Sequence, residues 1–102
     1  MGTSERPLIL LVEDDPTQLK IALYILKKKN LYDVISAEDA AKALALAESR
    51  SPALIISDYY LPGEDGLSLC TRIKSNPGLR NTMFMLLTAV FTALICTRSG
   101  PS

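Results

Sequence analysis

The sequence contains no histidine and no tryptophan, and it carries no excess of either charge. Without histidine, the chain has no imidazole that could act as a general base, bind a metal ion or accept a phosphoryl group. Eleven Lys and Arg residues balance eleven Asp and Glu residues, so the formal net charge is zero. A neutral chain shows no electrostatic sign of binding to nucleic acid or to an anionic membrane surface, and we expect neither as a partner.

Long hydrophobic runs and cysteine are also scarce. The longest mostly apolar run, residues 83–96, has fourteen residues, fewer than the roughly twenty that cross a bilayer. Cys70 and Cys96 are the two cysteines, and the first residues lack the apolar stretch of a secretory signal. We therefore expect a cytoplasmic protein with reduced thiols. At 102 residues and 48% hydrophobic content, the chain fits one globular domain.

Short apolar runs alternate with amphipathic segments along the chain. The runs do not alternate polar with apolar residues, which is typical of strands that are covered on both faces. Asp15 followed by Pro16 has the order of an N-cap and a first helical residue, and Ser36 with Asp39 resembles a capping box. This order predicts parallel β-α-β units, hence an α/β sandwich. The expected strands are 8–12, 34–35, 53–56 and 83–87, and the expected helices are 16–29, 38–49 and 67–75.

Acidic residues stand where two of these strands end. Glu13, Asp14 and Asp15 follow the first strand, and Asp58 follows the third. In parallel sheets the working site lies beyond the carboxyl ends of the strands, where the strand order reverses. Carboxylates that converge there raise each other's pKa unless a cation is present. Oxygen ligands without histidine favour Mg²⁺, and a carboxylate beside Mg²⁺ can accept a phosphoryl group.

Each of these residues also has a structural interpretation. Asp15 fits a helix cap better than a ligand, and Glu13 and Asp14 could form a solvated strand end. Asp58 could be a turn residue before Leu61–Gly63. Thr88 adds a hydroxyl at the end of the fourth strand, where an isolated threonine is usually structural. The combination is more specific than its parts, because both acidic clusters fall at the same edge of the expected sheet.

Three sequence blocks resemble the response-regulator receiver domain of two-component signalling. They are residues 10–16 (LLVEDDP), 54–66 (LIISDYYLPGEDG) and 86–89 (LLTA), and the middle block is the most specific. Their order and spacing are similar to those of the family over about residues 7–89. The resemblance implies a flavodoxin-like three-layer sandwich whose parallel sheet has the strand order 2-1-3-4-5.

The resemblance also implies a function. Asp58 matches the aspartate that accepts a phosphoryl group from a phosphohistidine on a sensor histidine kinase or a phosphotransfer protein. Glu13, Asp14 and Asp58 match the Mg²⁺-binding carboxylates, and the backbone carbonyl of Tyr60 matches a further ligand. Thr88 matches the switch hydroxyl. Such a module assists its own phosphorylation and is not a turnover enzyme.

The end of the chain departs from the family pattern. Receiver domains continue with a helix, a strand that ends in Lys-Pro and a last helix, and that lysine contacts the phosphoryl group. Only fourteen residues follow Thr88, and none is lysine. We expect an N-terminal extension (1–6), a partial receiver domain (7–89) and an atypical apolar tail (90–102), with the last helix, strand and helix missing or replaced. β-Branched and aromatic residues in the tail favour a strand, either replacing the fifth or extending the fourth.

Two other functions stay open on the sequence. A degenerate receiver could act only as an interaction module. A phosphatase of the haloacid dehalogenase type also uses a strand-end aspartate with Mg²⁺, but it needs Asp-x-Asp where this chain has Glu13–Asp15. We also expect self-association through residues 83–96, because the missing elements would uncover the edge and faces of the fourth strand. Pairing of strands is the first choice and packing of helices the second, and a tail folded back as a fifth strand in a monomer is the alternative.

Overall fold

A computed structural model describes residues 6–87, 93–97 and 100–101. Its regular elements alternate strand and helix up to the fourth strand, as the apolar runs predict, and two further strands follow. The elements are β1 (Leu8–Val12), α1 (Pro16–Lys28), β2 (Asp33–Ala37), α2 (Ala40–Arg50), β3 (Leu54–Asp58), α3 (Gly66–Ser75), the 3₁₀ turn η1 (Pro77–Leu79), β4 (Met83–Leu87), β5 (Ala93–Thr97) and β6 (Gly100–Pro101).

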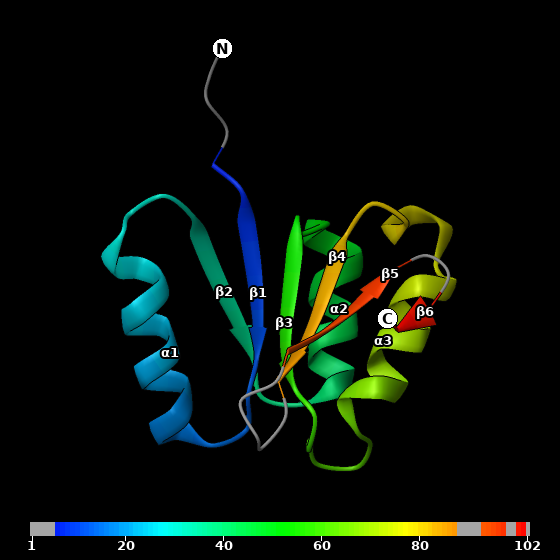
Figure 1. Cartoon of the computed structure of the whole chain (residues 1–102), viewed down its shortest axis with the longest axis horizontal. Helices are drawn as coiled ribbons and strands as arrows, with labels where there is room; N and C mark the ends of the chain where they lie inside the picture. Colours follow the sequence, from blue (N-terminus) through cyan, green and yellow to red (C-terminus); the bar gives the residue numbers. More distant parts are fainter. Residues whose placement is uncertain (1–5, 88–92, 98–99, 102) are drawn as a thin grey trace.

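The six strands form one sheet in the order β2-β1-β3-β4-β5-β6. β1 pairs in parallel with β2 and β3, and β3 pairs in parallel with β4. This order confirms the α/β fold class and the 2-1-3-4 part of the expected topology. In Figure 1, α2 and α3 lie behind the sheet, whereas α1 lies beside β2 and covers neither β3 nor β4.

One face of the sheet forms the hydrophobic core with α2 and α3. Leu10, Ile55 and Phe84 are paired across β1, β3 and β4, and all three are fully buried. Small residues on α2, among them Ala43 and Ala47, let this helix pack closely on the sheet. No residue of α1 belongs to this core or packs against it. α1 therefore covers the opposite face, beside β2.

The helix starts follow from local capping. Asp15 is the N-cap of α1, where its side chain accepts a hydrogen bond from the backbone N–H of Thr17 at 3.1 Å, and Pro16 takes the first helical position as expected. The prediction for the second helix is wrong by two residues. α2 begins at Ala40 because Asp39 caps it, accepting from the Lys42 N–H at 2.8 Å. Ser36 lies inside β2 and takes no part in the cap.

Two expectations, one about the edge of β4 and one about the thiols, are corrected by the structure. β5 pairs with β4 in antiparallel orientation, with Phe84 opposite Cys96 and Leu87 opposite Ala93. A strand in the tail is thus confirmed, but the idea that the edge of β4 is left unpaired is wrong. Cys70 is buried and disulfide-bonded, which contradicts the expectation of reduced thiols.

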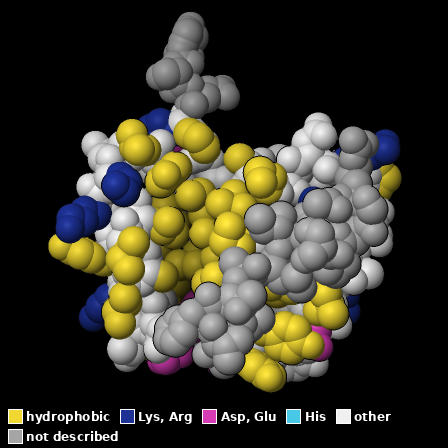
Figure 2. Space-filling model, in the orientation of Figure 1, with side chains coloured by type: hydrophobic (Ala, Val, Ile, Leu, Met, Phe, Trp, Pro, Cys, Tyr) yellow, Lys and Arg dark blue, Asp and Glu magenta, His cyan; other side chains and the backbone are white. Residues whose placement is uncertain are grey.

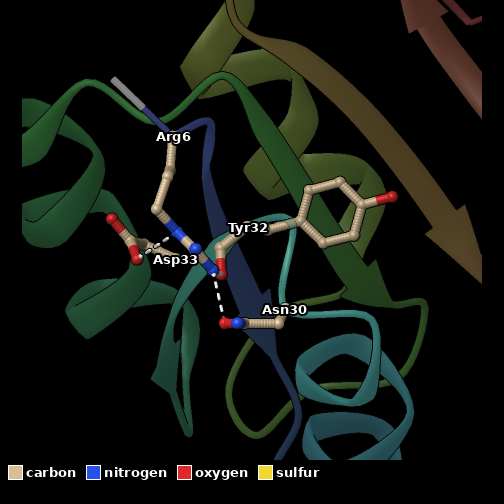
Figure 3. A network of polar contacts seen from close by, with 4 residues as sticks. All are labelled: Arg6, Asn30, Tyr32 and Asp33. Atoms are coloured by element: carbon tan, nitrogen blue, oxygen red, sulfur yellow. Dashed lines mark hydrogen bonds and ion pairs between the residues drawn. The ribbon is translucent and has the colours of Figure 1, made fainter. Parts of the chain in front are cut away.

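Arg6 joins the start of β1 to the connection between α1 and β2 (Figure 3). Its Nε donates to Asp33 Oδ1 at 3.2 Å, and its Nη2 donates to Asn30 Oδ1 at 3.0 Å and to the Tyr32 carbonyl at 2.9 Å. These groups are exposed, so the ion pair contributes about 0.2–1 kcal/mol at most.

Among the described residues, no helix is long and apolar enough to cross a membrane.

Candidate functional site

The site lies at the carboxyl ends of β1 and β3. Because these strands are parallel neighbours, with Val12 opposite Ser57, the residues that follow them emerge side by side. One carboxylate oxygen from each of Glu13, Asp14 and Asp58 lies within 4.8 Å of the others. The structure therefore brings together the three carboxylates that the sequence singles out, at the predicted edge of the sheet.

Two of the three carboxyl groups have a raised pKa. Partial burial is the largest cause for both Glu13 and Asp58. Negative charge adds to it, because Asp14 raises the pKa of both groups and Asp58 raises that of Glu13. Backbone hydrogen bonds oppose the rise, among them the Asp15 N–H, which donates to Glu13 Oε2 at 3.2 Å. The three groups thus form a pocket of unbalanced negative charge that favours a proton or a cation.

The loop between β3 and α3 has a fixed path beside this pocket. The Tyr59 N–H donates to the Leu87 carbonyl at 3.0 Å, and the Gly66 N–H donates to the Tyr59 carbonyl at 2.6 Å. Gly63 turns the loop with φ +84°, a conformation that other residues rarely adopt. Tyr60 lies in this loop two residues after Asp58, and its side chain is exposed. The loop therefore holds the Tyr60 backbone next to the carboxylates.

Gly66 fixes the distance between α3 and the end of β3. A Cβ at this position would lie 2.5 Å from the Asp58 carbonyl oxygen and 2.5 Å from a methyl group of Leu86. The preceding residue, Asp65, caps α3 by accepting from the Ser68 N–H at 2.8 Å. The sequence marks Gly66 only as the residue before a helix, whereas α3 begins at Gly66. Its close approach to Asp58 could have been suspected from the Asp-Gly pair that closes the most specific block.

An ion pair near this loop was missed by the sequence analysis. Arg72 on α3 contacts Glu64 Oε1 at 3.2 Å, and Glu64 Oε2 is buried without a hydrogen-bond partner in the described part of the chain. The two residues are eight positions apart, a spacing that neither helical nor strand periodicity highlights. The pair ties the loop to the helix that follows it.

Two further residues, Asp15 and Thr88, were also considered as candidates for the site. Asp15 lies outside the carboxylate cluster and caps α1, which agrees with its structural interpretation. Thr88 lies outside the described residues, so its expected role as a switch hydroxyl stays a prediction.

The donor set fits Mg²⁺. All three side-chain donors are carboxylate oxygens, the ligands that Mg²⁺ prefers. Asp14 is exposed and Glu13 and Asp58 are half-buried, so an ion held by them could keep several waters. Burial is the main cause of the two raised pKa values, and a bound cation would offset the mutual repulsion that adds to it.

Comparison with known proteins shows what kind of domain carries this pocket. The model of the response regulator receiver domain matches residues 9–95. The chain belongs to the response-regulator receiver family. This confirms the resemblance in the three sequence blocks and places the chain in two-component signalling. The match extends past residue 89, where we expect the receiver segment to end, so that boundary stays a prediction.

The relatives include a transcriptional regulator and a histidine kinase. The chain is 38% identical to the alkaline phosphatase synthesis transcriptional regulatory protein PhoP of Bacillus subtilis, over 65% of this chain and 27% of that protein. It is 36% identical to the histidine kinase P4 of Formosa agariphila, over 83% of this chain and 6% of that protein. The chain thus spans less than a third of either relative.

Solved structures show the same architecture. The signal receiver domain of an HD domain-containing protein from Pseudomonas fluorescens superimposes with a TM-score of 0.73 at 38% identity, covering 82% of this chain and 65% of that one. A response regulator from Chloroflexus aurantiacus gives a TM-score of 0.76 at 28% identity, covering 80% and 66%. The receiver fold is therefore shared over most of this chain.

Proposed function

We propose that this chain is a phosphoacceptor module in which Asp58 takes a phosphoryl group from a phosphohistidine on a partner protein. Glu13, Asp14 and Asp58, with the backbone carbonyl of Tyr60, would hold Mg²⁺. The observation that carries this proposal is the convergence of three carboxylates within 4.8 Å at the ends of β1 and β3. Membership in the receiver family supports the same function.

The chemistry requires an ionised Asp58. One carboxylate oxygen forms a bond to phosphorus while the bond between phosphorus and the histidine nitrogen breaks, and the nitrogen keeps the electron pair. The product is an acyl phosphate. Glu13, Asp14 and Asp58 would hold a cation, which would neutralise charge between the carboxylates and the incoming phosphoryl oxygens. Burial and Asp14 raise the pKa of Asp58, so a cation that favours the ionised form would also prepare the nucleophile.

Positioning carries most of the remaining catalysis in phosphoryl transfer. Gly66 and the Tyr59 hydrogen bonds hold the end of β3 and its loop in one arrangement. Asp58 is therefore presented at a fixed place beside Glu13 and Asp14 rather than on a free turn. This geometry supports the interpretation of Asp58 as a phosphoacceptor.

The proposal can be tested with a small phosphoryl donor. The parent chain, Asp58→Asn and Asp39→Asn are incubated with acetyl phosphate and Mg²⁺, and the intact mass is measured over time. We expect the parent and Asp39→Asn to gain one phosphoryl group and Asp58→Asn to gain none. Asp39 serves as the matched control because it caps α2 outside the carboxylate cluster.

The outcomes separate the competing functions. An equal mass gain in the parent and Asp58→Asn, or no gain in any protein, contradicts the assignment of Asp58. Continuous release of phosphate from the donor, many times the protein concentration, would favour the phosphatase alternative. We expect uptake to be slow, because the last lysine of the chain is Lys74 and the family's phosphoryl-contacting lysine has no counterpart after Thr88.

The partner we propose is a sensor histidine kinase or a phosphotransfer protein of the cytoplasm. Relatives with this domain include the sensor histidine kinase AruS of Pseudomonas aeruginosa and a DNA-binding regulator, RpaA of Synechocystis. Either architecture delivers phosphoryl groups to, or through, a receiver module.

A second candidate function is that of an interaction module that is not phosphorylated. The absence of any lysine after Lys74 favours it, since the family uses that lysine to contact the phosphoryl group. In that case Mg²⁺ would still bind the pocket, but acetyl phosphate would leave the mass of the parent chain unchanged. The mass measurement therefore decides between the two candidates.

A further inference from the structure

A cavity of about 470 Å³ lies at the amino ends of β1 and β3, at the end of the sheet opposite the carboxylates (Figure 1). The Ala53 N–H donates to the Leu8 carbonyl at 2.9 Å and joins the two sides of the cavity. Its volume falls within the range of about 300–1,000 Å³ that is typical of small-molecule sites. Six residues line it: Arg6, Pro7 and Leu8 where β1 begins, and Arg50, Ser51 and Ala53 between the end of α2 and the start of β3.

The charged side chains that line this cavity are both arginines, and none of the six lining residues is acidic. In Figure 2, most of the visible acidic side chains lie at the lower end of the molecule, away from the amino ends of β1 and β3. The Arg50 side chain forms no ion pair with any described residue. Glu48, two residues earlier, accepts from Asn76 Nδ2 at 3.3 Å and does not line the cavity. Arg50 therefore presents a positive charge that the described residues leave unbalanced.

Arg6 is held by groups that do not line the cavity. Its Nε and Nη2 donate to Asp33, Asn30 and the Tyr32 carbonyl (Figure 3). Its Nη1 donates to none of the residues that the structure describes, so it keeps donors for a ligand. Asp33 offsets one of the two positive charges beside the cavity, which leaves an excess of one.

We propose that this cavity binds the carboxylate of a small organic acid, whose apolar part packs against Pro7, Leu8 and Ala53. A guanidinium group presents parallel N–H donors that match the two oxygens of a carboxylate. A single negative charge balances the excess of one positive charge, whereas a dianion exceeds it. The three apolar side chains carry no polar atom, so they gain most from contact with an apolar group of the ligand.

Ser51 adds a hydroxyl to the lining of the cavity. It ends α2 in the left-handed conformation, with φ +47°, and its N–H donates to the Ala47 carbonyl at 2.9 Å. Glycine is common at such helix ends because it adopts this conformation without strain. The serine hydroxyl makes no hydrogen bond within the described part of the chain, so it is able to donate to the carboxylate beside Arg50.

Arg50 also has a structural interpretation. It stands in the last turn of α2, where a positive charge offsets the negative end of the helix dipole. That role needs a positive charge and not the planar fork of a guanidinium, so lysine fulfils it equally well. Paired hydrogen bonds to a carboxylate need the fork. The substitution Arg50→Lys therefore separates the two interpretations.

Titration of the ¹⁵N-labelled chain with butyrate, followed by the amide signals, tests the proposal. We expect the Ser51 and Ala53 signals to shift along one saturable curve, while those of Asp58 and Tyr59, at the other end of the sheet, stay in place. Butylammonium has the same apolar part without the negative charge, and it should bind at least about tenfold more weakly. Acetate, which lacks most of the apolar part, should also bind more weakly than butyrate.

Three variants identify the groups that bind the carboxylate. Arg50→Gln should weaken the binding of butyrate about tenfold, because it removes a charge-assisted pair of hydrogen bonds. Arg50→Lys should bind more weakly than the parent but more tightly than Arg50→Gln. Arg80→Gln is the matched control, because it removes the same charge at an exposed position that does not line the cavity, and it should bind like the parent. Arg50 is also exposed, so its variants should fold.

Three results would overturn the proposal. They are equal affinity for butyrate in the parent and Arg50→Gln, shifts in the parent that do not saturate, and tighter binding of inorganic phosphate than of butyrate. The last would contradict the assignment to a singly charged ligand with an apolar part. The titration uses neither Mg²⁺ nor a phosphoryl donor, so this proposal and the proposed function of Asp58 can fail independently.

Discussion

The two faces of the sheet are formed by alternate residues of the same strands, and they differ in how deeply these residues are buried. On β4, Phe84 is fully buried against α2 and α3, whereas Met83, one residue earlier, is 56% exposed. Both residues are large and apolar, so hydrophobicity alone does not separate them. The difference comes from what the rest of the chain supplies to each face. Two helices cover one face, and among the described helices α1, beside β2, is the one that lies on the other.

A sheet that is covered mainly on one face can still bring Glu13, Asp14 and Asp58 together at its edge. The end of β3 is held by Gly66 and Leu86, both of which are buried on the covered side. The carboxylates then project from the ends of β1 and β3, where covering helices are not required. The face covered by α2 and α3 carries the buried core, and the opposite face of β4 keeps Met83 and Leu87 exposed.

The largest effect should come from substitutions on β4 that compare the two faces directly. Phe84→Ala removes a fully buried ring, which should lower the free energy of unfolding by about 3–5 kcal/mol. Met83→Ala, on the exposed side, should lower it by less than about 1 kcal/mol. Urea denaturation measures both. Equal losses in the two variants would show that the faces are packed alike.

A smaller effect is expected where α3 meets β3. Gly66→Ala places a Cβ 2.5 Å from the Asp58 carbonyl oxygen, so helix or strand must shift, at a cost of about 1–3 kcal/mol. Gly78→Ala is the control, since its nearest contact would be Asn76 Oδ1 at 3.3 Å. Thermal unfolding should show a clear loss for Gly66→Ala and little for Gly78→Ala. An unchanged melting temperature for Gly66→Ala would contradict the close packing.

The start of α1 and the position of the acidic pocket could be predicted from the sequence more accurately than the long-range contacts. Asp15-Pro16 fixes the start of α1, and parallel topology brings Glu13 and Asp58 to one edge from residues 45 positions apart in the chain. The second helix was predicted two residues too early because Glu38 and Asp39 both suit a first turn, and only the hydrogen bond from Lys42 to Asp39 identifies the cap.

Contacts between residues that depend on how the elements pack could not be predicted from the sequence. β5 could be expected as a strand from its composition, but its antiparallel pairing with β4 depends on the path of the chain between them. The Glu64–Arg72 ion pair and the contact of Gly66 with Asp58 depend on where α3 docks. Likewise, Ile9 and Met83 are equally apolar in sequence, and only the register and the position of α1 make one buried and the other exposed.

The smallest effect concerns the charge of the pocket. In the folded chain the pKa values of Glu13 and Asp58 lie above those of free carboxyl groups. The folded state therefore binds protons more tightly than the unfolded state, and stability falls as pH rises from the ordinary carboxyl pKa of about 4 through the raised values. Without Mg²⁺, Asp58→Asn should be more stable than the parent at neutral pH, by a few degrees in melting temperature.

The gap between Asp58→Asn and the parent should narrow as pH falls toward about 4, because the folded chain takes up the proton on Asp58 at a higher pH than the unfolded chain does. Glu38→Gln controls for the loss of one negative charge, because Glu38 pairs with Lys42 and lies outside the cluster. Melting temperatures between pH 4 and pH 7 provide the comparison. A parent that is more stable than Asp58→Asn at neutral pH, without any divalent ion, would contradict the account of the pocket.

The central claim is that Glu13, Asp14 and Asp58 act as one cation site, and Mg²⁺ titration tests it most directly. Tyrosine fluorescence follows the titration, because the chain has no tryptophan and Tyr59 and Tyr60 adjoin the pocket. The parent and Glu38→Gln should show the same saturable change, and Asp14→Asn should bind at least about tenfold more weakly. Equal Mg²⁺ affinity in the parent and Asp14→Asn, or no saturable change in the parent, would contradict the claim.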